Sequence, residues 1–111
     1  METSINIQEL KNLLREANEL HLIEALPPKY FEQGHLPLAI NIPLESDDDL
    51  IKQKLVNLES TIVTYCTGKT CPNSGKLANR LRSLGYKNVF AFEGGKEEWV
   101  KSGNKLTREV K

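Results

Sequence analysis

Two cysteines, Cys66 and Cys71, are the residues of this chain best suited to chemistry, and they are its only cysteines. Cys66 follows an apolar, β-branched run at residues 61–65, and a loop separates it from a helical pattern at residues 74–84. In this order, backbone N–H groups of the loop and of the first helical turn converge on the sulfur, and the helix dipole favours negative charge there. Both effects lower the pKa of a thiol, and the thiolate is its reactive form. The segment therefore predicts Cys66 as an activated nucleophile rather than a small buried apolar residue.

The loop after Cys66 supplies the residues expected to bind a substrate. These are Thr67, Gly68, Lys69, Thr70, Asn73 and Ser74. Gly68 gives the loop freedom to turn its amides inward. Lys69, the only charged residue of the loop, can attract an anionic substrate or lower the pKa of Cys66, and a solvated lysine is an equal alternative. Asn73 and Ser74 lie where the helix starts, so we interpret them first as caps and second as substrate contacts.

Cys71 has two open interpretations. It can attack an oxidised Cys66, such as a sulfenate, and form a disulfide, which would make it a resolving thiol, or it can be a bystander. A structural disulfide across so short a loop would stabilise little. Two sulfurs at this spacing, with His21 and His35 far upstream, match no common zinc pattern. We expect neither a metal nor a cofactor.

Composition indicates one ordinary globular domain over residues 1–111. The chain has 39% hydrophobic and 27% charged residues, and fifteen basic residues balance fifteen acidic ones. No global charge favours nucleic acid or an anionic membrane. There is no apolar run long enough to span a bilayer and no pattern of a secretory signal. We therefore expect a cytoplasmic protein whose thiols are kept reduced.

Hydrophobic periodicity and turn residues predict strands that alternate with helices. The expected strands are residues 20–25, 38–42, 61–65 and 88–92, and the expected helices are residues 6–17, 28–33, 47–57, 74–84 and 96–101. Ser46 is the expected cap of the third helix, and Asp47, Asp48 and Asp49 are interpreted as charge at its start rather than as metal ligands. The alternation predicts an α/β fold, a mostly parallel sheet with helices on both faces. Cys66 then lies at the carboxyl end of a central strand, where such folds place active sites.

Four segments, in this order, resemble the rhodanese domain family over nearly the whole chain. They are residues 22–43, residues 63–66, residues 84–86, and residues 93–95 followed by Trp99. The resemblance implies the rhodanese fold and a persulfide on Cys66, which Cys71 would attack if it is a resolving thiol. It also implies a small anionic sulfur donor such as thiosulfate, and cyanide, a thiol or a sulfur-relay protein as acceptor. Trp99 is expected in the core. In this family context His35 resembles a structural residue that hydrogen-bonds the backbone, with general-base catalysis as the weaker alternative, and His21 is expected to be structural or exposed.

The chain departs from the family pattern at three places. Glu24-Ala25-Leu26 stands where Asp-x-Arg is usual, so the acid is kept but the arginine and its ion pair are expected to be lost. Leu38 stands where glycine is common, which bears on local backbone geometry. The loop from Cys66 to Ser74 is about two residues longer than in many single-domain relatives, which leaves the preferred donor open.

Two other functions compete with sulfur transfer. A phosphatase or arsenate reductase on the same fold uses a Cys-x5-Arg loop whose guanidinium grips the oxyanion. Here Pro72 occupies that position and the loop has no arginine, which argues strongly against that class. The second competitor is a non-catalytic or redox-sensing rhodanese-like module that serves in binding, which the missing arginine after the second strand favours.

Overall fold

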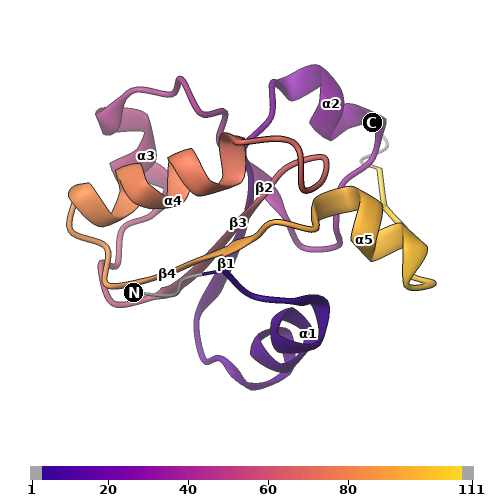
Figure 1. Cartoon of the computed structure of the whole chain (residues 1–111). Coiled ribbons are helices and arrows are strands. Elements are labelled where there is room, and N and C mark those ends of the chain that lie inside the picture. Colours follow the sequence, from indigo (N-terminus) through magenta and orange to yellow (C-terminus); the bar gives the residue numbers. More distant parts are fainter. Residues whose placement is uncertain (1–3, 109–111) are drawn as a thin grey trace.

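The computed structural model describes residues 4–108, which form a four-stranded, wholly parallel sheet in the order β2-β1-β3-β4 (Figure 1). The strands are β1 (Leu20–Glu24), β2 (Ile40–Asn41), β3 (Thr61–Tyr65) and β4 (Asn88–Phe92). β3 pairs along its whole length with β1 on one side and β4 on the other. The carboxyl ends of these three strands therefore meet at one edge of the sheet, and the predicted parallel α/β architecture is confirmed.

Five helices connect and cover the strands. They are α1 (Ile7–Glu16), α2 (Pro28–Gln33), α3 (Asp48–Lys54), α4 (Asn73–Ser83) and α5 (Gly95–Lys101). α3 and α4 lie on one face of the sheet and α1 on the other (Figure 1). None of the helices within residues 4–108 has the length and apolar character needed to cross a membrane.

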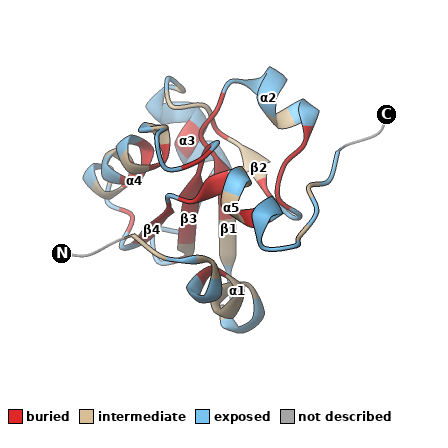
Figure 2. Ribbon diagram, turned by 45° about the vertical axis from the view of Figure 1, so that its right-hand side comes forward, coloured by how far each residue is buried: buried red, intermediate tan, exposed pale blue. Residues whose placement is uncertain are grey.

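The sheet separates two apolar cores (Figure 2). One core packs α3 and α4 against the sheet and includes Ile23, Ile51, Ile62, Leu77 and Leu81. The other packs α1 and α5 against the opposite face and includes Leu10, Val63, Tyr65, Phe92 and Trp99. Alternate residues of β3 enter opposite cores because successive side chains of a strand point to opposite faces. The strand that carries Cys66 at its end is thus packed from both sides.

The sequence predicts β3 and β4 with their observed bounds, but the predicted strand at residues 38–42 is too long. β2 has only two residues, because Leu38 adopts a left-handed backbone with φ of 71° and Ala39 N–H closes a turn onto Leu36 O at 3.1 Å. The Leu38 side chain is 86% exposed, so no burial offsets this backbone strain. A glycine would adopt the same backbone without that strain.

The helix predicted at residues 47–57 is also shorter in the structure and is capped by a different residue. α3 ends at Lys54, and its N-cap is Asp47, whose carboxylate accepts the Leu50 N–H at 2.8 Å. Ser46 instead donates its backbone N–H to Pro43 O in the preceding turn, so Ser46 is not the predicted cap. The acidic residues 48 and 49 do lie in the first helical turn, where the dipole favours negative charge.

The segment before α1 is attached to the sheet. Asn6 caps α1, because its side chain accepts the Glu9 N–H and the Glu9 carboxylate accepts the Asn6 N–H, both at 2.8 Å. Just before this cap, Ser4 pairs with Ala91 in parallel orientation, and Ile5 N–H donates to Ala91 O at 2.9 Å. This short segment therefore lies along the outer side of β4.

Candidate active site

Cys66 lies where β3 leaves the sheet, and α5 holds the backbone on either side of the Cys66–Thr67 peptide. Its side chain is completely buried. Lys96 N–H donates to Cys66 O at 3.0 Å, and Glu97 N–H donates to Thr67 O at 2.9 Å. These are first-turn N–H groups of α5, which have no partner inside their own helix. They therefore fix the start of the cysteine loop against the start of α5.

This close approach requires a glycine on the α5 side of the contact. Gly95 has φ of 60°, and a side chain there would collide with Cys66 O and with the Thr67 backbone. At Gly68, a Cβ would meet only side-chain atoms of the exposed Glu97, which can move aside, so the space there does not require glycine. Gly68 does not have a positive φ, so its backbone lies in a region that other residues also adopt.

The surroundings of the Cys66 sulfur favour the protonated thiol. The sulfur lies 3.3 Å from Cys71 O and donates to it, so a carbonyl oxygen faces the position where a thiolate would form. Burial, followed by the hydrogen bond with the Cys71 side chain, raises the pKa of Cys66 to about 11, against the opposing effect of hydrogen bonds from the Ser74 backbone and hydroxyl. The predicted lowering of the thiol pKa is therefore wrong. The helix N-terminus does contribute in the expected direction, but burial outweighs it.

The residues at the start of α4 have different contacts from those predicted. The N-cap position is Pro72, which makes no side-chain cap bond, so neither Asn73 nor Ser74 is the cap. Asn73 Nδ2 donates to Ala25 O at 3.2 Å and thereby ties the helix start to the segment after β1. Ser74 is buried beside Cys66, and Thr64 Oγ1 donates to its carbonyl at 2.8 Å. Of the predicted loop residues, Ser74 thus contacts the Cys66 sulfur, and Gly68 O lies 4.0 Å from the same atom.

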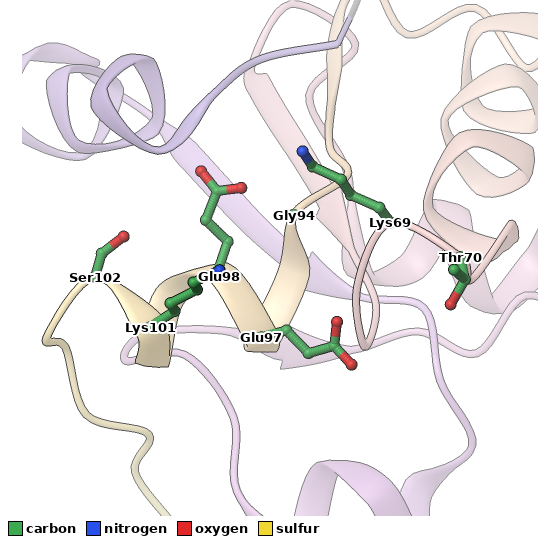
Figure 3. Close-up of a pocket in the computed structure, with 7 residues that line it drawn as sticks. All are labelled: Lys69, Thr70, Gly94, Glu97, Glu98, Lys101 and Ser102. Carbon is green, nitrogen blue, oxygen red and sulfur yellow. The ribbon is translucent and has the colours of Figure 1, made fainter.

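The exposed part of the loop borders a hollow of about 460 Å³ next to α5 (Figure 3). Its lining residues are Lys69, Thr70, Gly94, Glu97, Glu98, Lys101 and Ser102. Lys69 also borders a second hollow on the side of Ile5 and Glu93. Thr67 is exposed at the same loop. An anion approaching the loop would meet Lys69 but also the carboxylates of α5, so the field at this entrance is mixed.

Near the loop, Glu24 forms a buried ion pair. Its partner is not the arginine that is usual in the family but Lys96. Glu24 ends β1 with no exposed surface, and Lys96 Nζ lies 3.1 Å from its Oε2. Tyr65 OH donates to Glu24 Oε1 at 2.8 Å and accepts the Leu36 N–H at 3.1 Å. Lys96 Nζ also donates to Tyr30 O at 2.8 Å. The ion pair of the missing arginine is absent as expected, but Glu24 is still paired, because Lys96 of α5 supplies the cation.

Glu24, Lys96 and Tyr65 form a polar cluster that holds the backbone around the nucleophile. Tyr65 directly precedes Cys66, and the Lys96 N–H binds Cys66 O. Burial and the Glu24 charge raise the pKa of Tyr65. Neither Tyr65 nor Lys96 was predicted as a site residue. The usable signal was Glu24 itself, since an acid at the end of a buried strand needs a cation.

The two histidines and the tryptophan have the predicted structural roles. His35 is buried, its Nδ1 lies 3.0 Å from Leu36 O, and its ring stacks on Phe31 with centroids 3.8 Å apart. Its backbone exchanges two hydrogen bonds of 2.8 Å with Thr107. His21 lies 3.2 Å from the exposed Glu19. Trp99 belongs to the core, and its Nε1 donates to Lys105 O.

The fold and the site define a class of protein. It is the class of α/β domains that place a buried cysteine at the carboxyl edge of a parallel sheet, before a loop and the first turn of a helix. Among such domains, the family model of the rhodanese-like domain matches residues 6–102 of this chain. The chain belongs to the rhodanese-like domain family.

Its relatives include both sulfurtransferases and a regulator. The chain is 32% identical to an HTH-type transcriptional regulator, Rv0324, of Mycobacterium tuberculosis over 80% of this chain and 38% of the regulator. It is 30% identical to the thiosulfate sulfurtransferase PspE of Escherichia coli over 69% of this chain and 72% of PspE. The structure of a thiosulfate sulfurtransferase from Pseudomonas aeruginosa superposes with a TM-score of 0.84 at 27% identity, over 97% of this chain and 20% of that one. The chain thus spans about two fifths of the length of the regulator. Its family includes sulfurtransferases.

Proposed function

We propose that this domain is a sulfurtransferase that carries sulfane sulfur as a persulfide on Cys66. The donor is thiosulfate or a persulfide, and the acceptor is cyanide or a thiol, including a cysteine of a sulfur-relay protein. The observation that supports this most is Cys66 at the carboxyl end of the central strand, beside the first turn of α4. The sulfurtransferase names of two relatives support the same chemistry.

The reaction has two steps of nucleophilic displacement. In the first, the Cys66 thiolate attacks the outer sulfur of thiosulfate, a new S–S bond forms, and sulfite leaves with the electron pair of the old S–S bond. In the second, cyanide or a thiolate attacks the outer sulfur of the persulfide, and the Cys66 thiolate is regenerated. Neither step requires an external oxidant, metal or cofactor.

The loop residues have separate roles in this proposal. The first step requires loss of the Cys66 proton and a turn of the Cys71 carbonyl away from the sulfur, because a carbonyl oxygen repels a thiolate. Ser74, through its N–H and hydroxyl, stabilises the resulting anion. Lys69 attracts the anionic donor, while Thr67, Gly68, Thr70 and Asn73 shape the loop around it. The reaction needs a reduced thiol, which a cytoplasmic location would provide.

The test is the formation of thiocyanate from thiosulfate and cyanide by the purified chain. Wild type and Cys71→Ser are expected to produce thiocyanate, and Cys66→Ser is not. Intact mass after exposure to thiosulfate alone should show a gain of one sulfur atom on Cys71→Ser and none on Cys66→Ser. Absence of both thiocyanate and sulfur gain, with thiosulfate and with persulfide donors, would refute the sulfurtransferase.

A binding or redox-sensing module is the second candidate, and one observation favours it. The raised pKa of Cys66 leaves little thiolate at neutral pH, which suits an idle cysteine. The transcriptional regulator among the relatives shows that a similar domain occurs within a larger regulatory protein. The same assay separates the two candidates, since a binding module produces no thiocyanate and gains no sulfur.

A further inference from the structure

The cysteine loop brings a second thiol, that of Cys71, close to Cys66. Cys66 and Cys71 are both free, and the Cys71 side chain is near enough to Cys66 to raise the pKa of its thiol. The Cys66 sulfur also lies 3.3 Å from the carbonyl oxygen of Cys71. A disulfide would require the sulfurs to approach to about 2 Å. Cys71 therefore lies next to the atom that would carry the proposed persulfide, and its sulfur would have to move closer to form the bond.

The backbone of the loop brings Cys71 back over Cys66. Cys71 N–H donates to Gly68 O at 3.0 Å, which closes a tight turn after the strand. Pro72 follows at once and occupies the N-cap position of α4. The turn before Cys71 and the helix start after it therefore both hold Cys71 near Cys66.

The two sulfurs differ in their access to solvent. Cys66 has no exposed surface, whereas Cys71 is half-buried. An external thiol that reduces a Cys66–Cys71 disulfide can therefore reach the Cys71 sulfur more easily. This division suits a buried carrier and a more accessible resolving thiol.

We infer that Cys71 gives the domain a second outcome for the bound sulfur, its release as hydrogen sulfide. This inference rests on the proposed persulfide on Cys66. The Cys71 thiolate attacks the Cys66 Sγ, a Cys66–Cys71 bond forms, and the outer sulfur leaves as hydrosulfide with the electron pair of the persulfide bond. Two external thiols then reduce the disulfide and are themselves oxidised to a disulfide.

The complete cycle balances without any other reagent. One thiosulfate and two thiols give one sulfite, one hydrogen sulfide and one disulfide. The internal attack competes with external acceptors and has the advantage of an intramolecular reaction, because the thiol is held at the reacting atom. The domain would therefore be a thiosulfate reductase when no strong acceptor is present, and a sulfurtransferase when one is.

The test is a single turnover without reductant. Reduced wild type, freed of reductant under anaerobic conditions, is mixed with thiosulfate, and sulfite, sulfide, free thiols and intact mass are measured. Wild type is expected to release about one sulfite and one sulfide per chain, to lose both thiols and to end two hydrogen atoms lighter. Cys71→Ser is expected to release the sulfite, release no sulfide and keep the extra sulfur atom. Cys71→Ala serves as a second variant, and circular dichroism confirms folding of both.

The outcomes separate this inference from the function on which it rests. A wild-type protein that releases sulfite but keeps a stable persulfide, as Cys71→Ser does, would overturn the role of Cys71 and leave the sulfurtransferase intact. Sulfide release that is equal in wild type and both Cys71 variants would also overturn it. Absence of sulfite in all three proteins would instead refute the persulfide on Cys66, and the inference would fall with it.

Discussion

Removing the cation of the buried cluster by Lys96→Met should destabilise the domain far more than removing a surface cation. Methionine keeps much of the apolar stem of lysine, so the change acts mainly on the charge. Glu24 would remain buried with no exposed surface and without its cation 3.1 Å away. Coulomb's law at that distance, with an effective dielectric constant of about 20, gives an attraction of about 5 kcal/mol. Loss of one partner of a buried pair typically costs about 3–5 kcal/mol, and we expect that loss here.

The chain offers a matched control at its surface. Lys87 and Glu59 form an ion pair of similar length, 3.4 Å, but their side chains are 64% and 71% exposed. Solvent screening reduces such a pair to about 0–1 kcal/mol. Lys87→Met should therefore lower the free energy of unfolding by less than about 1 kcal/mol. Both substitutions remove the same ammonium group, so the contrast measures its burial together with the hydrogen bond from Lys96 to Tyr30 O.

The assay is equilibrium unfolding in urea, followed by the fluorescence of Trp99, the only tryptophan, which is buried in the core. The double variant Glu24→Gln with Lys96→Met should recover most of the lost stability, because it leaves no unpaired buried charge. A loss below about 1 kcal/mol for Lys96→Met would refute the reasoning. A double variant no more stable than Lys96→Met alone would refute it as well, since the cost would then not come from the unpaired carboxylate.

Three further predictions concern the loop and the backbone. Because burial raises the pKa of Cys66 to about 11, sulfite release in a single turnover should accelerate about tenfold per pH unit from pH 7 towards 10, and a plateau below pH 8 would contradict this. Leu38→Gly should raise the free energy of unfolding by about 1 kcal/mol through relief of the left-handed backbone, whereas Leu38→Ala keeps φ positive and should gain nothing in urea titrations. Gly95→Ala should lower both stability and thiocyanate formation, because its Cβ meets the Cys66 carbonyl. Gly75→Ala, in open space within α4, should instead stabilise by about 0.5–1 kcal/mol, and equal effects of the two alanines would contradict the argument.

Local sequence signals predicted those helices and strands whose bounds are set by residues close to them in the sequence. β3 and β4 are β-branched and aromatic runs bounded by turn residues, and they form with the predicted bounds. Gly34 and Gly85 stop helices as expected, each with a positive φ. The place of Cys66 followed from the same logic, since a parallel sheet needs only the order of strand, loop and helix.

Contacts between distant segments were beyond the sequence signals. Lys96 reaches Glu24 across the sheet edge, from the helix that follows the last strand, and no spacing in the chain indicates this partner. The pKa of Cys66 was mispredicted for a related reason. The helix N-terminus is a local feature, but the burial that outweighs it arises from tertiary packing. The predicted capping residues of α3 and α4 were wrong because several polar residues compete at each helix start. Asn73, for example, donates to the segment after β1 instead.

The short segment at Ser4 and Ile5 affects how the domain behaves at high concentration. An open parallel sheet has two edge strands, and each can template the addition of another chain. Here the Ile5 N–H already occupies Ala91 O on one edge, and the opposite edge strand, β2, has only two residues. Neither side offers a long row of backbone groups to a second sheet. Both edges of the sheet that contains β3, the strand before Cys66, are therefore protected against edge-to-edge aggregation.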